Sequence, residues 1–173
     1  MGRWLPDALS AARGVLALAL PFVVDRPALL VALYLLAGLT DVLDGPLARR
    51  LGTAGPRGAR IDSVADVLLF VVATWLVARA LGADAVPLLL AAAVVAALKV
   101  AAVVVGAARF GRLVMRHTTA NRVAGVAVFT APLLSVAGWT GALWCVVAAA
   151  GTAAVDELVV QTRATTPDPD RRS

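Results

Sequence analysis

The sequence predicts an all-α integral membrane protein, a bundle of six transmembrane helices with both termini in the cytoplasm. Three observations lead to this fold class. Of the 173 residues, 61% are hydrophobic and only 16% are charged, whereas a soluble domain carries roughly 25% charged residues. Apolar stretches long enough to cross a bilayer recur along the chain. The arginines gather between alternate stretches, which is typical of an oriented membrane protein.

Each apolar stretch is about 20 residues long and is bounded by charged or turn-forming residues. Helices are expected over residues 9–24, 28–49, 59–80, 85–108, 118–137 and 139–161. In chain order, they are separated by Asp25-Arg26-Pro27, Gly52 to Gly58, Gly82-Ala83-Asp84, Arg109 to Arg116, and Gly138. Residues 1–163 therefore form one membrane domain. Residues 164–173 are polar and contain two prolines, so a disordered cytoplasmic tail is expected there.

The formal net charge of +5 is explained by topology. With the N-terminus in the cytoplasm, all arginines except Arg26 and Arg79 lie in cytoplasmic segments, and Lys99 alone lies within a span. Such a charge distribution also suits anionic lipid headgroups. A plasma-membrane, multi-pass protein is expected, with no nucleic acid as a partner.

Four aspartates at the cytoplasmic ends of the second and third helices stand out in this apolar chain. Asp41 and Asp44 are three residues apart, and Asp62 and Asp66 are four apart. Either spacing places both carboxylates on one helical face. The connecting loop is short, so the two helices should be antiparallel neighbours whose acidic faces meet. Helix capping or a solvated loop is the alternative, but it suits Asp62 and Asp66 poorly because they enter an apolar run.

Four converging carboxylates at the edge of the hydrocarbon would repel one another and lose hydration. Divalent cations remove both penalties. An all-oxygen ligand set without His or Cys suits Mg²⁺ or Mn²⁺, and four carboxylates are enough for two divalent ions. Gly45 and Gly58 leave room for phosphate groups beside the acids, and Arg49 offers a fixed positive charge. Together these residues predict a diphosphate-binding site.

The segment resembles the signature of the CDP-alcohol phosphatidyltransferase family, D-x-x-D-G-x-x-A-R, eight residues, then G-x-x-x-D-x-x-x-D. The matching positions are Asp41, Asp44, Gly45, Ala48, Arg49, Gly58, Asp62 and Asp66. The N-terminal run from Pro6 to Arg13 is similar to the family's P-N-x-L-[ST]-x-x-R, with Asp7 in the place of Asn. The run from His117 to Arg122 is similar to a segment of the phosphatidylglycerophosphate synthase-like branch, with His117 in the place of Lys.

The resemblance implies a phospholipid synthase that transfers the phosphatidyl group of CDP-diacylglycerol to a small polar alcohol and releases CMP. By the family's pattern, the four aspartates hold two metal ions and Asp66 is also the catalytic base. Asp41, Gly45, Ala48, Arg49 and Gly58 are expected to bind the CDP-lipid. The family also implies a homodimer.

The acceptor site is expected at Lys99, Arg109, Arg116 and His117. Lys99 lies in the middle of an apolar run, so it should face either a polar acceptor pocket or a structural carboxylate. The arginines are equally well explained by topology. Glycerol 3-phosphate is the leading acceptor, and inositol phosphate, inositol and serine are alternatives.

A cation- or proton-coupled transporter is the hypothesis from another class. Transporter sites tend to lie near the bilayer midplane, at broken helices between internal repeats. The aspartates here lie toward the ends of their helices, and the sequence has no obvious repeat. These observations favour the enzyme.

Overall fold

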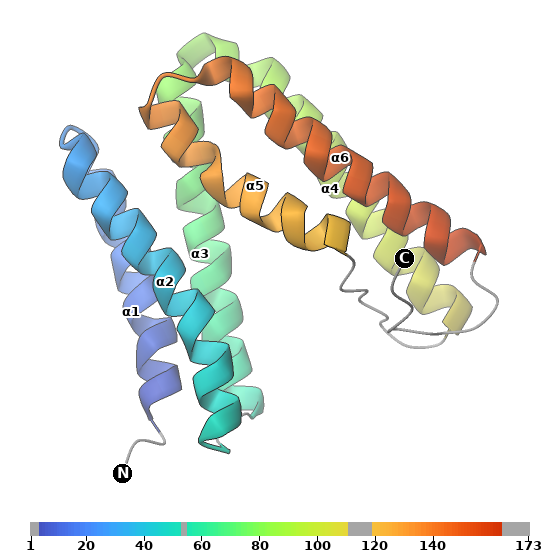
Figure 1. Ribbon diagram of the computed structural model, residues 1–173, viewed down its shortest axis with the longest axis horizontal. Helices are drawn as coiled ribbons and strands as arrows, with labels where there is room; N and C mark the ends of the chain where they lie inside the picture. Colours follow the sequence, from blue (N-terminus) through green and yellow to red (C-terminus); the bar gives the residue numbers. More distant parts are fainter. Residues whose placement is uncertain (1–3, 53–54, 111–118, 164–173) are drawn as a thin grey trace. The chain divides into compact units, whose positions relative to one another are not determined.

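The computed structural model describes residues 4–52, 55–110 and 119–163, and it is helical with no strand in that part of the chain (Figure 1). The α-helices lie close to the predicted ranges, and two short 3-10 helices extend α1 and link α3 to α4. The elements are α1 (Leu5–Ala19), η1 (Leu20–Val23), α2 (Pro27–Arg50), α3 (Pro56–Leu81), η2 (Gly82–Asp84), α4 (Ala85–Phe110), α5 (Thr119–Val136) and α6 (Thr140–Arg163).

The ends of the helices follow local backbone chemistry. Pro27 and Pro56 are the first residues of α2 and α3, where the fixed φ of proline suits a helix start and its missing N–H is not needed. Gly138 ends α5 with a φ of 77°. The amide of Gly138 donates to Ser135 and that of Trp139 to Leu134. This double hydrogen bond is the Schellman motif, which satisfies the last carbonyls of the helix and reverses the chain.

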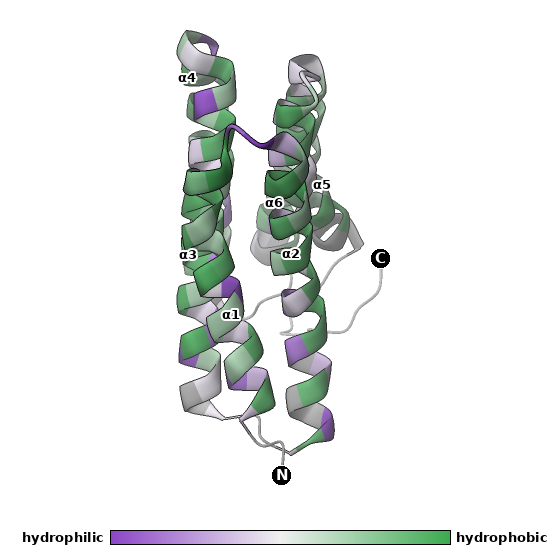
Figure 2. Ribbon diagram, turned by 90° about the vertical axis from the view of Figure 1, so that its left-hand side faces the viewer, coloured by the Kyte–Doolittle hydropathy of each residue, from purple (hydrophilic) through white to green (hydrophobic). Residues whose placement is uncertain are grey.

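Four helical segments of the described chain are long and apolar enough to cross a membrane. They are Leu5–Val23, Pro27–Asp44, Gly58–Val105 and Thr140–Val160. The third segment includes both α3 and α4, and the apolar part of α5 is shorter, at Val123–Val136. The helices are hydrophobic along most of their length (Figure 2).

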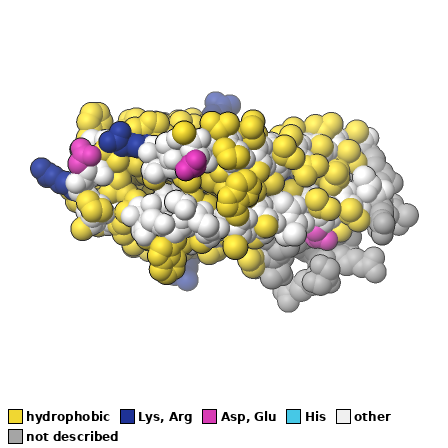
Figure 3. All heavy atoms as spheres, turned by 90° about the horizontal axis from the view of Figure 1, so that it is seen from above, with side chains coloured by type: hydrophobic (Ala, Val, Ile, Leu, Met, Phe, Trp, Pro, Cys, Tyr) yellow, Lys and Arg dark blue, Asp and Glu magenta, His cyan; other side chains and the backbone are white. Residues whose placement is uncertain are grey.

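Large apolar side chains cover much of the surface instead of lying in a core. Phe22, Val126 and Leu90 have exposed fractions of 89%, 67% and 63%. In the space-filling view, hydrophobic side chains dominate the face and charged ones are scattered (Figure 3). Such a surface is unfavourable in water and suits lipid. The protein is therefore a membrane protein.

The chain divides into two compact units, residues 1–76 and residues 77–173. In the first unit, α1 packs against α2. Ala17, Leu20, Leu30 and Tyr34 are all buried. Gly14 of α1 lies near α3, because a Cβ at this position would be 3.9 Å from side-chain atoms of both Ala65 and Leu68. A Cβ here would make only ordinary van der Waals contact with α3.

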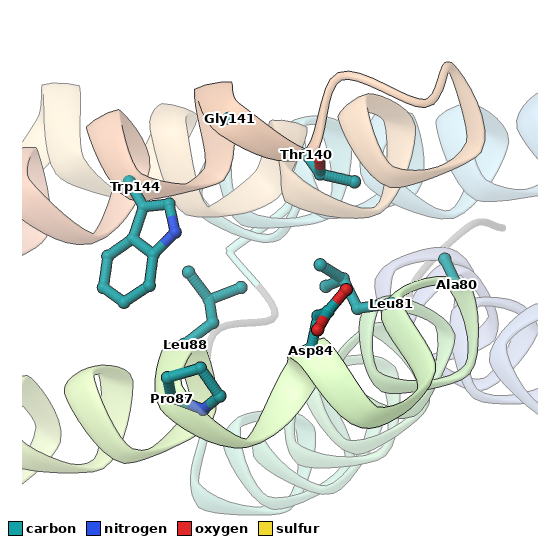
Figure 4. A pocket seen from close by; sticks show the side chains of 8 residues that line it. All are labelled: Ala80, Leu81, Asp84, Pro87, Leu88, Thr140, Gly141 and Trp144. Atoms are coloured by element: carbon teal, nitrogen blue, oxygen red, sulfur yellow. The ribbon is translucent and has the colours of Figure 1, made fainter.

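In the second unit, α6 packs against both α4 and α5. One cluster joins Val77, Leu88 and Leu143, and another joins Ala124, Ala150 and Ala153. The alanines let the helix backbones approach. A depression of about 330 Å³ lies beside the start of α6. Its lining includes the carboxylate of Asp84 and the indole of Trp144 (Figure 4).

Candidate metal and phosphate site

The four aspartates predicted from the sequence converge on one arginine of α1. The guanidinium of Arg13 donates from Nη1 to Asp66 Oδ1 at 2.6 Å and from Nη2 to Asp44 Oδ2 at 2.8 Å. It also donates from Nη1 to Asp41 Oδ1 and from Nη2 to Asp62 Oδ1. All five side chains belong to the first compact unit.

The pairing follows the antiparallel run of α2 and α3. Nη1 joins Asp41 of α2 to Asp66 of α3, and Nη2 joins Asp44 to Asp62. In each pair, one carboxylate comes from each helix, and the pair nearer the connecting loop is the one held by Nη2. The two helical faces therefore meet as their spacing predicts.

The cluster has a buried side and an exposed side. The side chain of Arg13 is 0% exposed and that of Asp44 is 9% exposed, whereas Asp41, Asp62 and Asp66 are 53%, 41% and 52% exposed. Ser10, one turn before Arg13, donates from Oγ to Asp44 Oδ2 at 3.1 Å. Ligands can therefore reach the carboxylates of Asp41, Asp62 and Asp66. The carboxylate of Asp44 is buried and accepts hydrogen bonds from Arg13 and Ser10.

The donor set suits a hard divalent cation. Asp41, Asp62 and Asp66 each offer one carboxylate oxygen, and these oxygens lie within 4.8 Å of one another. Oxygen ligands on one Mg²⁺ or Mn²⁺ are separated by similar distances, since each lies about 2.1 Å from Mg²⁺. Four ionised carboxylates and one guanidinium leave a formal charge of −3. Divalent cations would neutralise that remaining charge.

Arg13 and Ser10 are site residues to which the sequence analysis gave no role. The signal was present, because Pro6, Ser10 and Arg13 recur at intervals of four and three residues, which places them on one face of a helix. Pro6, Ser10 and Arg13 are all buried. A polar, buried helix face in a membrane protein requires partners, and the aspartates provide them.

Gly58 is placed where an added Cβ would push against the carboxylate of Asp7. A Cβ at this position would be 2.9 Å from Oδ1 of Asp7, which is shorter than any normal carbon–oxygen contact. Asp7 lies in the first turn of α1, and Gly58 in the first turn of α3. The predicted phosphate-pocket residues Gly45, Ala48 and Arg49 lie in α2, and their side chains fall outside the described part of the structure.

Among the predicted acceptor residues, the structure describes the side chain of Lys99. Its Nζ lies 3.4 Å from Oε2 of Glu157, which is 8% exposed. Lys99 therefore lies beside a structural carboxylate, which is one of the two environments expected for it. Arg109 lies in α4 with its side chain undescribed, and Arg116 and His117 fall outside the described residues.

The chain matches the family model of the CDP-alcohol phosphatidyltransferases over residues 3–155. This range includes Arg13 and both aspartate pairs. The family consists of phosphotransferases for substituted phosphate groups, and its members generally depend on divalent metals. No curated protein and no solved structure matches the chain.

Proposed function

Because the chain belongs to the CDP-alcohol phosphatidyltransferase family, we propose that it transfers the phosphatidyl group of CDP-diacylglycerol to a small polar alcohol. CMP is the other product. The observation that carries this proposal is the convergence of four carboxylates from two helices around one point. Because the family consists of transferases, its match to the chain favours an enzyme over a cation- or proton-coupled transporter.

Asp41, Asp44, Asp62 and Asp66 would hold two Mg²⁺ or Mn²⁺ ions. Bound there, the metals supply charge neutralisation on the diphosphate oxygens and on the leaving group. The half-exposed carboxylates of Asp41, Asp62 and Asp66 support this assignment, because a lipid diphosphate can approach them. Gly45, Ala48 and Gly58 would shape the nucleotide pocket, and Arg49 would bind a phosphate.

Asp66 would be the general base. The acceptor hydroxyl oxygen attacks the phosphorus that carries diacylglycerol, and its proton passes to the carboxylate of Asp66. The bond from this phosphorus to the bridging oxygen breaks, and its electron pair leaves with CMP. The exposed fraction of 52% supports this role, because an alcohol can reach the carboxylate.

Glycerol 3-phosphate is the proposed acceptor, as in the phosphatidylglycerophosphate synthase-like branch, with inositol phosphate, inositol and serine as alternatives. Lys99, Arg109, Arg116 and His117 are the proposed acceptor residues. The proposed topology has six spans, both termini and the active site on the cytoplasmic side of the plasma membrane, and a homodimeric assembly. The apolar helix surfaces support membrane insertion.

The decisive experiment supplies purified protein with labelled CDP-diacylglycerol, Mg²⁺ and each acceptor in turn, and measures CMP release. Wild-type protein should release CMP with one acceptor in preference to the rest. The Asp66→Asn variant should lose at least about 10²–10⁴-fold of that activity, the usual contribution of a general base, because it also removes a proposed metal ligand.

Asp84→Asn is the matched control, because Asp84 lies at the opposite end of α3 from the aspartate cluster, in η2. It should keep normal turnover. Absence of Mg²⁺-dependent CMP release with every acceptor would contradict the proposed reaction. Full activity in Asp66→Asn would remove Asp66 as the base.

A further inference from the structure

Arg13 occupies a position that no ordinary surface arginine takes. It is 0% exposed, and its two terminal nitrogens contact carboxylates from both α2 and α3. Its Nε is buried and has no hydrogen-bond partner among the described residues. The guanidinium is therefore committed to the four aspartates through Nη1 and Nη2.

Arg13 contacts three of the carboxylates that a metal ion would need. It binds Oδ1 of Asp41, Asp62 and Asp66. The same three residues each have an oxygen in the group that could ligate a metal. A guanidinium and a divalent cation at such short range repel each other, and the low dielectric of a buried site strengthens that repulsion.

The positive charge of Arg13 affects both the stability of the carboxylate cluster without a cation and the affinity of the cluster for a metal ion. Without a cation, four clustered carboxylates destabilise the fold through mutual repulsion and lost hydration. Arg13 offsets one of the four negative charges and orients the carboxylates by hydrogen bonds. It thus keeps the acidic faces of α2 and α3 together, and the same positive charge weakens the binding of a metal ion.

We propose that Arg13 is a positioning residue and a built-in counter-cation, which holds the four carboxylates together in the metal-free protein and competes with divalent cations for their oxygens. The inference rests on the proposed metal site. It concerns the affinity of that site and its stability without metal, so it can be tested without any substrate.

The test measures Mn²⁺ binding and thermal unfolding of the purified full-length protein. Electron paramagnetic resonance of free Mn²⁺ gives the affinity, and unfolding is followed in EDTA and in saturating Mn²⁺. The Arg13→Gln variant should unfold at a lower temperature than wild type in EDTA. It should bind Mn²⁺ at least about tenfold more tightly, because a positive charge has left the site. The rise in unfolding temperature caused by Mn²⁺ should accordingly be larger than in wild type.

Arg26→Gln is the matched control, since Arg26 is exposed and lies at the other end of α2 from the acidic cluster. It should match wild type in both measurements. Arg13→Lys provides the test if Arg13→Gln does not fold. A single ammonium cannot bridge both carboxylate pairs but keeps the positive charge, so this variant should bind Mn²⁺ more tightly than wild type and less tightly than Arg13→Gln.

Two outcomes of this experiment would overturn the inference, and they can be told apart. A variant that lowers the unfolding temperature equally in EDTA and in Mn²⁺, with unchanged Mn²⁺ affinity, would show a purely structural role and overturn the inference alone. Wild-type protein that binds no Mn²⁺ would overturn the proposed metal site and the inference together.

Discussion

At the scale of single residues, the contact between Gly58 and Asp7 links the N-terminal turn of α1 to the start of α3. A Cβ on Gly58 would overlap Oδ1 of Asp7 at 2.9 Å. Asp62 and Asp66 follow on the same helix, within its first three turns. An added methyl group would therefore push the carboxylate of Asp7 aside at the start of the helix that carries two of the four site carboxylates.

Gly58→Ala should lower CMP release by no more than about tenfold, because the end of the Asp7 side chain can move while the helix that carries Asp62 and Asp66 stays in place. The free energy of unfolding should fall by less than about 1 kcal/mol, because moving the Asp7 carboxylate costs little and the better helix propensity of alanine offsets part of that cost. The measurements are turnover and thermal unfolding of the purified variant.

The double variant Asp7→Ala/Gly58→Ala should recover stability relative to Gly58→Ala, since the overlap is gone. Gly141→Ala is the control, because Gly141 also lies in the first turn of a helix and a Cβ there meets nothing within 4 Å. Additive effects of the Asp7 and Gly58 substitutions would refute a direct clash.

At the scale of elements, the ion pair of Lys99 and Glu157 joins α4 to α6 inside the second unit. The carboxylate is buried and the ammonium is 38% exposed. Such a pair lies between the surface case, worth about 0–1 kcal/mol, and the fully buried case, in which removing one partner costs about 3–5 kcal/mol.

Lys99→Met should reduce the free energy of unfolding by about 1–3 kcal/mol, since it removes the cation beside a buried carboxylate. The double variant Lys99→Met/Glu157→Leu should recover most of the lost free energy of unfolding. Thermal unfolding of the two purified variants measures both effects. If Lys99 also binds the acceptor, the KM for the acceptor should stay raised in the double variant even though its stability returns. A double variant no more stable than Lys99→Met would show that the ion pair does not account for the loss.

At the scale of the whole molecule, the proposed six-span topology would place the turn after α2 and the turn after α3 on opposite sides of the membrane. Leu51 marks the first turn and Ala83 the second, and both are exposed. The natural chain has a single cysteine, Cys145. Cysteine labelling can therefore report the side of each turn.

In a Cys145→Ala background, a membrane-impermeant maleimide should label Ala83→Cys in intact cells. It should label Leu51→Cys only after permeabilisation, because the arginines that flank the turn after α2 favour a cytoplasmic position. The parent without an added cysteine should stay unlabelled. Labelling of both positions from the same side would mean that α3 does not cross the membrane.

Much of this architecture is contained in the sequence. An all-helical membrane protein was predicted from the high apolar content and from apolar stretches of about 20 residues. The approximate helix ranges were predicted from the Gly, Pro and Asp residues between these stretches. The spacing of Asp41, Asp44, Asp62 and Asp66 predicted two acidic helix faces that meet. These features are local, since helix periodicity alone decides which residues share a face.

Only the tertiary structure decided what meets those faces. It placed Arg13 among the four aspartates, Asp7 against Gly58, and Glu157 beside Lys99. Each of these partners lies on a different helix and dozens of residues away along the chain. Periodicity can predict that a polar face needs a partner, whereas the identity of the partner depends on how the helices pack in three dimensions.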